Sequence, residues 1–154
     1  MGVDPGIAAT GYGIIKIDGK NDAELLDYGV ISTLSNEKHP KRLQYIYESI
    51  LEVIERTGPD VIAIESLFHT HNLKALVDVS EAIGVITLAA ARYDLTVHKF
   101  TPLKVKSAIV GVGRARKEQV SLVIQNILNL DTQPKPHHAS DALAVALCYK
   151  NLFL

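Results

Sequence analysis

The apolar positions of the chain change period along its length, and this change separates predicted helices from predicted strands. Between residues 40 and 58, apolar side chains recur at the spacing of three to four residues that marks one face of a helix. The pattern ends at a Gly-Pro pair. The run DVIAIE follows at residues 60–65, and such a continuous apolar run is typical of a parallel strand buried on both faces.

The other segments complete an α/β pattern. The sequence predicts a short first strand in residues 1–6, which ends at Pro-Gly, and two strands joined by the turn-forming DGKND. These two strands span residues 10–17 and 23–33, a fifth strand spans 95–100, and helices are expected at 72–92, 102–110, 115–128 and 137–152. A hairpin followed by strand–helix–strand crossovers predicts a five-stranded mixed sheet flanked by helices. We expect residues 1–154 to form a single domain, since no repeat, low-complexity tract or linker interrupts them.

Two acids stand at the ends of predicted parallel strands. Asp4 precedes Pro-Gly, and Glu65 closes the apolar run of the fourth strand. Taken singly, Asp4 is explained as a turn former and Glu65 as a helix cap or ion-pair partner. Together they map to the edge of the sheet where ligands gather in such folds, and their like charges favour a divalent cation between them. Oxygen ligands at an open site favour Mg²⁺ or Mn²⁺.

The last predicted helix offers further ligands. In PHHASDALAVAL, His138 and Asp141 are three residues apart, and His137 and Asp141 are four apart. Either spacing places both groups on one helix face, so the spacing does not choose between the histidines. The alternative is a polar first turn in which Asp141 complements the helix dipole.

Composition and charge narrow the class of protein. The chain has a net charge of −1 and 47% apolar residues, enough for a sizeable core. It has no apolar stretch near the roughly 20 residues of a membrane span, and no signal-peptide architecture, so we expect a cytoplasmic protein without a membrane partner. The single cysteine, Cys148, lies in an apolar helical pattern, which predicts a buried, inert thiol in a reducing compartment.

Residues 98–117 hold six basic side chains and no acid. Such a segment is either a solvated face of the protein or a surface that binds phosphate groups.

Four segments, in this order and spacing, resemble the RuvC Holliday junction resolvases: GVDPGIAATGYGII, VIAIESLF, KVKSAIVGVGRARKEQV and ASDALAVAL. The resemblance implies a ribonuclease H-like fold. It also implies a homodimeric, magnesium-dependent endodeoxyribonuclease that nicks two strands of like polarity at a four-way junction during DNA recombination and repair. Two Mg²⁺ ions per subunit, replaceable by Mn²⁺, and a branch-migration helicase complex as a partner are further implications.

The resemblance also assigns roles to residues. The catalytic, metal-binding acids of the family fall on Asp4, Glu65 and Asp141, and the fourth ligand, commonly an aspartate, falls on His138. Phe68 matches an aromatic residue that stacks on bases, with a core phenylalanine as the alternative. The basic residues expected to contact the DNA backbone are Lys104, Lys106, Arg114, Arg116 and Lys117.

The helix at 72–92 is the candidate dimer face, because Ser80 and Gly84 lie on a stripe of small residues along it. The alternative is that this stripe packs on the sheet of its own subunit. A twofold dimer would present two sites to a twofold-symmetric junction.

Three other functions fit parts of the pattern. An actin-like or sugar-kinase-like ATP-binding protein shares the Asp-x-Gly…Thr-Gly hairpin, but needs two related domains. A non-catalytic junction-binding module is suggested by the histidine at position 138 and by a first strand with only three residues before Asp4. A ribonuclease H-like nuclease with another nucleic-acid substrate is the third alternative.

Overall fold

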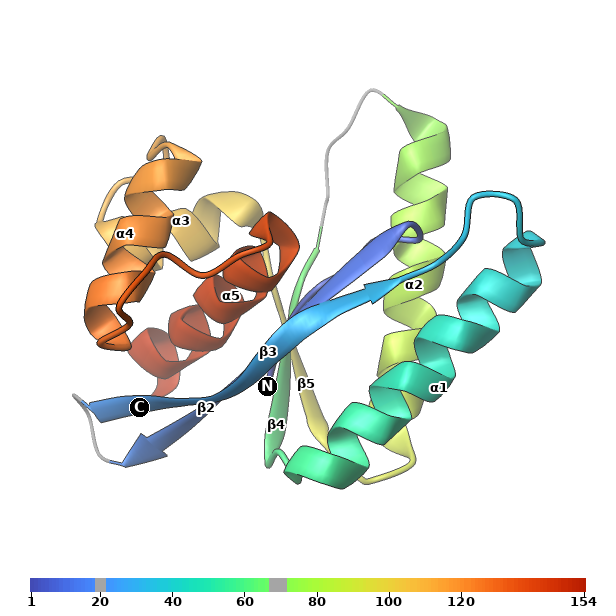
Figure 1. Ribbon diagram of the computed structural model, residues 1–154, viewed down its shortest axis with the longest axis horizontal. Helices are drawn as coiled ribbons and strands as arrows, with labels where there is room; N and C mark the ends of the chain where they lie inside the picture. The colour runs from blue at the N-terminus through green and yellow to red at the C-terminus, as the bar shows by residue number, and fades with distance from the viewer. Residues whose placement is uncertain (19–21, 67–71) are drawn as a thin grey trace.

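The computed structural model describes residues 1–18, 22–66 and 72–154. Its five strands form one sheet in the order β3-β2-β1-β4-β5 (Figure 1). The central strand β1 (Gly2–Asp4) pairs antiparallel with β2 (Ala9–Asp18) and parallel with β4 (Val61–Glu65). The outer strands are β3 (Asp22–Ser32) and β5 (Thr96–Phe100). This arrangement is the mixed sheet that the sequence predicts.

Helices cover both faces of the sheet (Figure 1). Helices α1 (His39–Thr57) and α2 (Leu73–Ala91) pack together on one face. On the other face, α5 (His137–Phe153) lies against β1 and β2, with α3 (Pro102–Val110) and α4 (Lys117–Ile127) beside it. None of the helices described, with residues 19–21 and 67–71 left aside, is long and apolar enough to cross a membrane.

The sheet divides the hydrophobic core into two layers, and strand β4 contributes side chains to both. Ile62 and Ile64 pack in the layer beneath α1 and α2, whereas Ala63 packs in the layer beneath α5. Because successive side chains of a strand point to opposite faces, Glu65 faces α5, as Ala63 does. Val3 of β1 belongs to the first layer, so its neighbour Asp4 also faces α5.

Two glycines let α5 lie directly on the sheet. A Cβ atom on Gly2 would lie 2.1 Å from the carbonyl oxygen of Ala142, and one on Gly11 would lie 1.9 Å from that of His138. No larger residue fits at these positions without moving the helix. The close approach therefore sets the height of the first turn of α5 above the end of β1.

The expected elements are all present, and the start of α4 differs from the prediction. The helix begins at Lys117, two residues later than expected, because the Gln119 side chain accepts a hydrogen bond from the backbone N–H of Arg116. Arg116 is thereby fixed as the N-cap in an extended conformation. Lys117 becomes the first residue of the helix.

Candidate active site

Three segments that are distant in sequence meet at one edge of the sheet. Asp4 ends β1 and Glu65 ends β4, and the parallel register of these strands places the two acids beside each other. The first turn of α5 lies over the same edge, held there by its contact with Gly11. The expected acids of β1, β4 and α5 are therefore neighbours in space.

The structure distinguishes between the two histidines that sequence spacing left open. Nδ1 of His138 lies 2.7 Å from Oδ2 of Asp4, at hydrogen-bond distance. The Asp4 side chain is 14% exposed, so this contact satisfies a largely buried carboxylate. His138, rather than His137, thus joins the acidic cluster.

Burial, reinforced by the charges of neighbouring carboxylates, raises the pKa values of Asp4 and Glu65. Burial is the main cause of the raised pKa of Asp4, which the hydrogen bond from His138 partly offsets and the charge of Asp141 reinforces. The pKa of Glu65 rises to about 7, first because of burial and then because of the nearby carboxylates of Asp4 and Asp141. These are the properties of a site that gains stability from a positive charge.

Two of the expected basic residues face this cluster. The Nζ atom of Lys117 lies 2.9 Å from Oδ2 of Asp141 and forms an ion pair with it. Lys106 of α3, together with Lys117, lowers the pKa of Glu65 through its charge. The other basic residues expected to contact DNA, Lys104, Arg114 and Arg116, are exposed. Phe68 lies outside the described residues.

The donor set fits a divalent cation. Three carboxylates and one imidazole converge, and carboxylate oxygens are the ligands that Mg²⁺ and Mn²⁺ prefer. A cation between the carboxylates would offset their mutual repulsion, which adds to burial in raising the pKa of Glu65.

A second group of potential ligands lies between α1 and α2. Within residues 1–18, 22–66 and 72–154, the group of three whose ligand atoms lie within 4.8 Å of one another is His39, Asp78 and Glu81. Nε2 of His39 is 2.5 Å from Oε2 of Glu81. This group was not among the predicted sites, although Asp78 and Glu81 have the i, i+3 spacing of one helix face. Among Asp4, Glu65, His138 and Asp141, by contrast, no three ligand atoms lie within 4.8 Å of one another.

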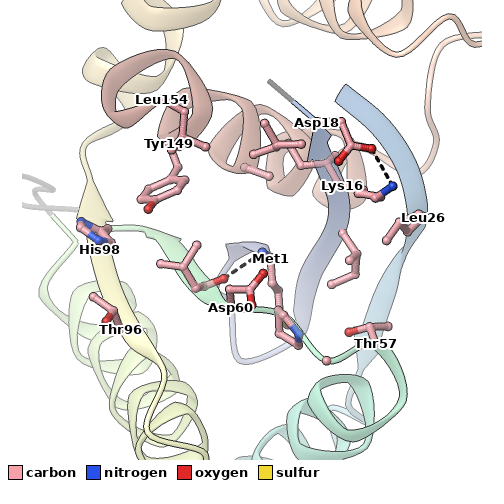
Figure 2. A pocket seen from close by; sticks show the side chains of 17 residues that line it. Met1, Lys16, Asp18, Leu26, Thr57, Asp60, Thr96, His98, Tyr149 and Leu154 are labelled. Atoms are coloured by element: carbon pink, nitrogen blue, oxygen red, sulfur yellow. Dashed lines mark hydrogen bonds and ion pairs between the residues drawn. The ribbon is translucent and has the colours of Figure 1, made fainter. Parts of the chain in front are cut away.

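A cavity lies beside Met1 (Figure 2), at the end of β1 opposite Asp4. It has a volume of about 750 Å³, and its lining includes Met1, Ile15, Val61, His98 and Tyr149. The amino group of Met1 donates a hydrogen bond of 2.9 Å to the carbonyl oxygen of Val61. The cavity thus occupies the space into which the register of β1 would continue between β2 and β4.

Comparisons with known proteins agree with this architecture. Residues 1–149 match the family Crossover junction endodeoxyribonuclease RuvC. The chain is 48% identical over 149 residues to the protein of that name from Alkaliphilus metalliredigens, covering 97% of this chain and 90% of the relative. It is 46% identical over 153 residues to the one from Natranaerobius thermophilus, covering 99% and 94%. The structure of T. thermophilus RuvC in complex with Holliday junction substrate superposes with a TM-score of 0.91 at 36% identity, covering 96% of this chain and 90% of that one. The fold is therefore ribonuclease H-like, and the chain belongs to the RuvC family of crossover junction endodeoxyribonucleases.

Proposed function

We propose that this protein is a structure-specific endodeoxyribonuclease that resolves four-way DNA junctions by metal-dependent hydrolysis. The observation that carries the proposal is the meeting of Asp4, Glu65 and Asp141 at one sheet edge, with Lys106 and Lys117 facing them. The T. thermophilus relative was solved with a Holliday junction substrate, which supports the same substrate here. A branch-migration helicase complex as a partner follows from family membership alone.

The residues proposed to hold the metal are Asp4, Glu65, His138 and Asp141. Two Mg²⁺ ions per subunit, replaceable by Mn²⁺, would supply an activated water and stabilise the charge on the departing oxygen. The carboxylates act as ligands rather than nucleophiles, so no covalent enzyme intermediate is expected. His138 orients Asp4 through their 2.7 Å contact, and burial keeps bulk water away from Asp4. Hydrolysis would leave 5′-phosphate and 3′-hydroxyl ends.

The basic side chains are proposed to hold the DNA backbone beside these ligands. Lys106 and Lys117 lie close enough to the acids to bind the phosphate that is cut or its neighbour. Lys104, Arg114 and Arg116 would extend the track along α3 and the start of α4, where they are exposed. Stacking of Phe68 on a base is a proposal from the family resemblance.

Homodimerisation is proposed to pair two active sites across the junction. The exposed face of α2 carries Leu73, Val77 and Leu88, which are 74%, 55% and 58% exposed. Ser80 and Gly84 lie between them on the same face and are exposed, so this stripe does not pack on its own sheet. Such an exposed stripe of apolar and small residues on a single helix suits a twofold interface.

The dimer proposal is tested by Val77→Glu, which places a charge in the centre of this face. We expect the variant to sediment as a monomer and to lose paired nicking of a junction. Leu34→Glu is the control, because Leu34 is 71% exposed and lies outside α2. A Val77→Glu protein with the same sedimentation coefficient as the parent would reject α2 as the interface.

The catalytic proposal is tested by Asp4→Asn on a synthetic four-way junction. We expect retained junction binding and loss of cleavage, because an amide is a weaker cation ligand than a carboxylate. Asp78→Asn, in the other group of potential ligands, is the matched control and should cleave like the parent. Cleavage by Asp4→Asn at the parent rate would remove Asp4 from the site. Parallel assays on three-way and linear duplex DNA separate junction resolution from other nuclease activity.

The role of His138 as the fourth ligand is tested by His138→Asp. Histidine ligates metal only as the neutral imidazole, and an imidazole takes up a proton more readily than a carboxylate does. We expect the activity of the parent to fall more steeply on acidification than that of the variant. Superimposable pH profiles of the two enzymes would exclude His138 as a ligand.

A further inference from the structure

The ion pair between Lys117 and Asp141 has a consequence for cation binding. We propose that Lys117 competes with the divalent cation for Asp141, and that cation binding releases its ammonium group toward a DNA phosphate. This inference rests on the proposed function. It means that Lys117 links cation binding at the acidic cluster to DNA binding at the protein surface.

The position of Lys117 is unfavourable for the helix that carries it. As the first residue of α4, it places a positive charge at the positive end of the helix dipole. Its side chain reaches instead to α5, where Nζ lies 2.9 Å from Oδ2 of Asp141. The contact with Asp141 therefore accounts for the position of this lysine better than helix stability does.

The charge of Lys117 acts on the whole acidic cluster. The hydrogen bond to Asp141 is the main cause of the raised pKa of Lys117, and the charges of Asp141, Asp4 and Glu65 add to it. An ammonium group in this position neutralises part of the charge that attracts a cation. It also occupies an oxygen of Asp141 that a cation would need.

The Lys117 side chain can leave without disturbing the core. It is 62% exposed, whereas the Asp141 side chain is 27% exposed and stays with α5. The side chain is a flexible stem that can turn toward solvent and a phosphate. Lys106 differs, because its charge acts on Glu65 but no ion pair joins it to Asp141 in the described part of the chain.

The inference is tested by Mn²⁺ titration calorimetry in the absence of DNA. The Asp78→Asn protein serves as the background, so that the group between α1 and α2 does not contribute. We expect Lys117→Met to bind Mn²⁺ about tenfold more tightly than the background protein, because it frees Asp141 and removes a positive charge. Lys106→Met should gain less than about threefold, since it removes a charge but no contact. Lys117→Arg, which keeps the charge, should stay within about twofold of the background protein.

A second readout follows Lys117 itself. Acylation of individual lysines, measured by mass spectrometry, should accelerate severalfold at Lys117 when Mn²⁺ is added and stay unchanged at Lys104. Equal Mn²⁺ affinity in Lys117→Met and the background protein, or an unchanged acylation rate at Lys117, would overturn the inference while leaving the proposed function intact. If the background protein fails to bind Mn²⁺, the metal site fails, and with it both proposals.

Discussion

Replacing Gly11 by alanine tests how the fold positions the site. Gly11 of β2 lies beneath the first turn of α5, and an added Cβ would lie 1.9 Å from the carbonyl oxygen of His138. Ordinary contact begins at about 3.4 Å, so the backbone carrying His138 must retreat by about 1.5 Å, away from Asp4. A misplacement of about 1 Å in an active site can cost about 100-fold in rate. Overpacking of this kind costs about 1–3 kcal/mol of stability.

The assay is single-turnover cleavage of a four-way junction, at a temperature well below the thermal midpoints of all variants. Gly29→Ala of β3 is the matched control, because the atoms nearest to its added Cβ belong to the Tyr12 side chain, with Oη at 2.7 Å, and not to α5. We expect both variants to lose stability, and only Gly11→Ala to lose about 100-fold in cleavage. Cleavage by folded Gly11→Ala at the parent rate would refute the argument that this contact positions the site.

Three further predictions concern stability and reactivity. Burial and nearby carboxylates raise the pKa of Glu65 from 4.5 to about 7, so the folded protein holds a proton that the unfolded chain releases in this window. In EDTA, the free energy of unfolding should therefore fall as the pH rises from about 4.5 to about 7, with at most about 3 kcal/mol from Glu65, and Glu65→Gln should make this slope shallower in urea titrations. Burial raises the pKa of the Cys148 thiol to about 11, so a thiol reagent at pH 8 should label the folded protein at least about 100-fold more slowly than the urea-unfolded chain. An apolar dipeptide added before Met1 should continue β1 between Ile15 and Val61 and fill the cavity in Figure 2. It should raise the thermal midpoint by about 2–4 °C for each kcal/mol gained, whereas a Gly-Ser extension should not.

Much of the fold follows from the sequence because its elements carry strong periodic patterns. The apolar run of β4 identified a strand buried on both faces, and Ile62 and Ala63 do pack in different layers. The start of α4 was wrong by two residues, because the cap formed by Arg116 and Gln119 depends on a side-chain contact that apolar periodicity does not report.

The neighbourhood of the acids was predictable, but the contacts around them were not. Parallel strands end at one edge, so Asp4 and Glu65 were expected to meet there. Spacing could not separate His138 from its neighbour, since both lie in the first turn of α5, and it is the packing of that turn on β2 that brings His138 to Asp4. The ion pair of Lys117 depends on how α4 packs beside α5, which no local pattern encodes.

The most direct test of the account is anomalous diffraction from crystals soaked in Mn²⁺. We predict a peak between the carboxylates of Asp4, Glu65 and Asp141, with their oxygens as ligands of the ion. Clear density for these side chains with no peak among them, and manganese bound instead at His39, Asp78 and Glu81, would contradict the assignment of the strand-end site.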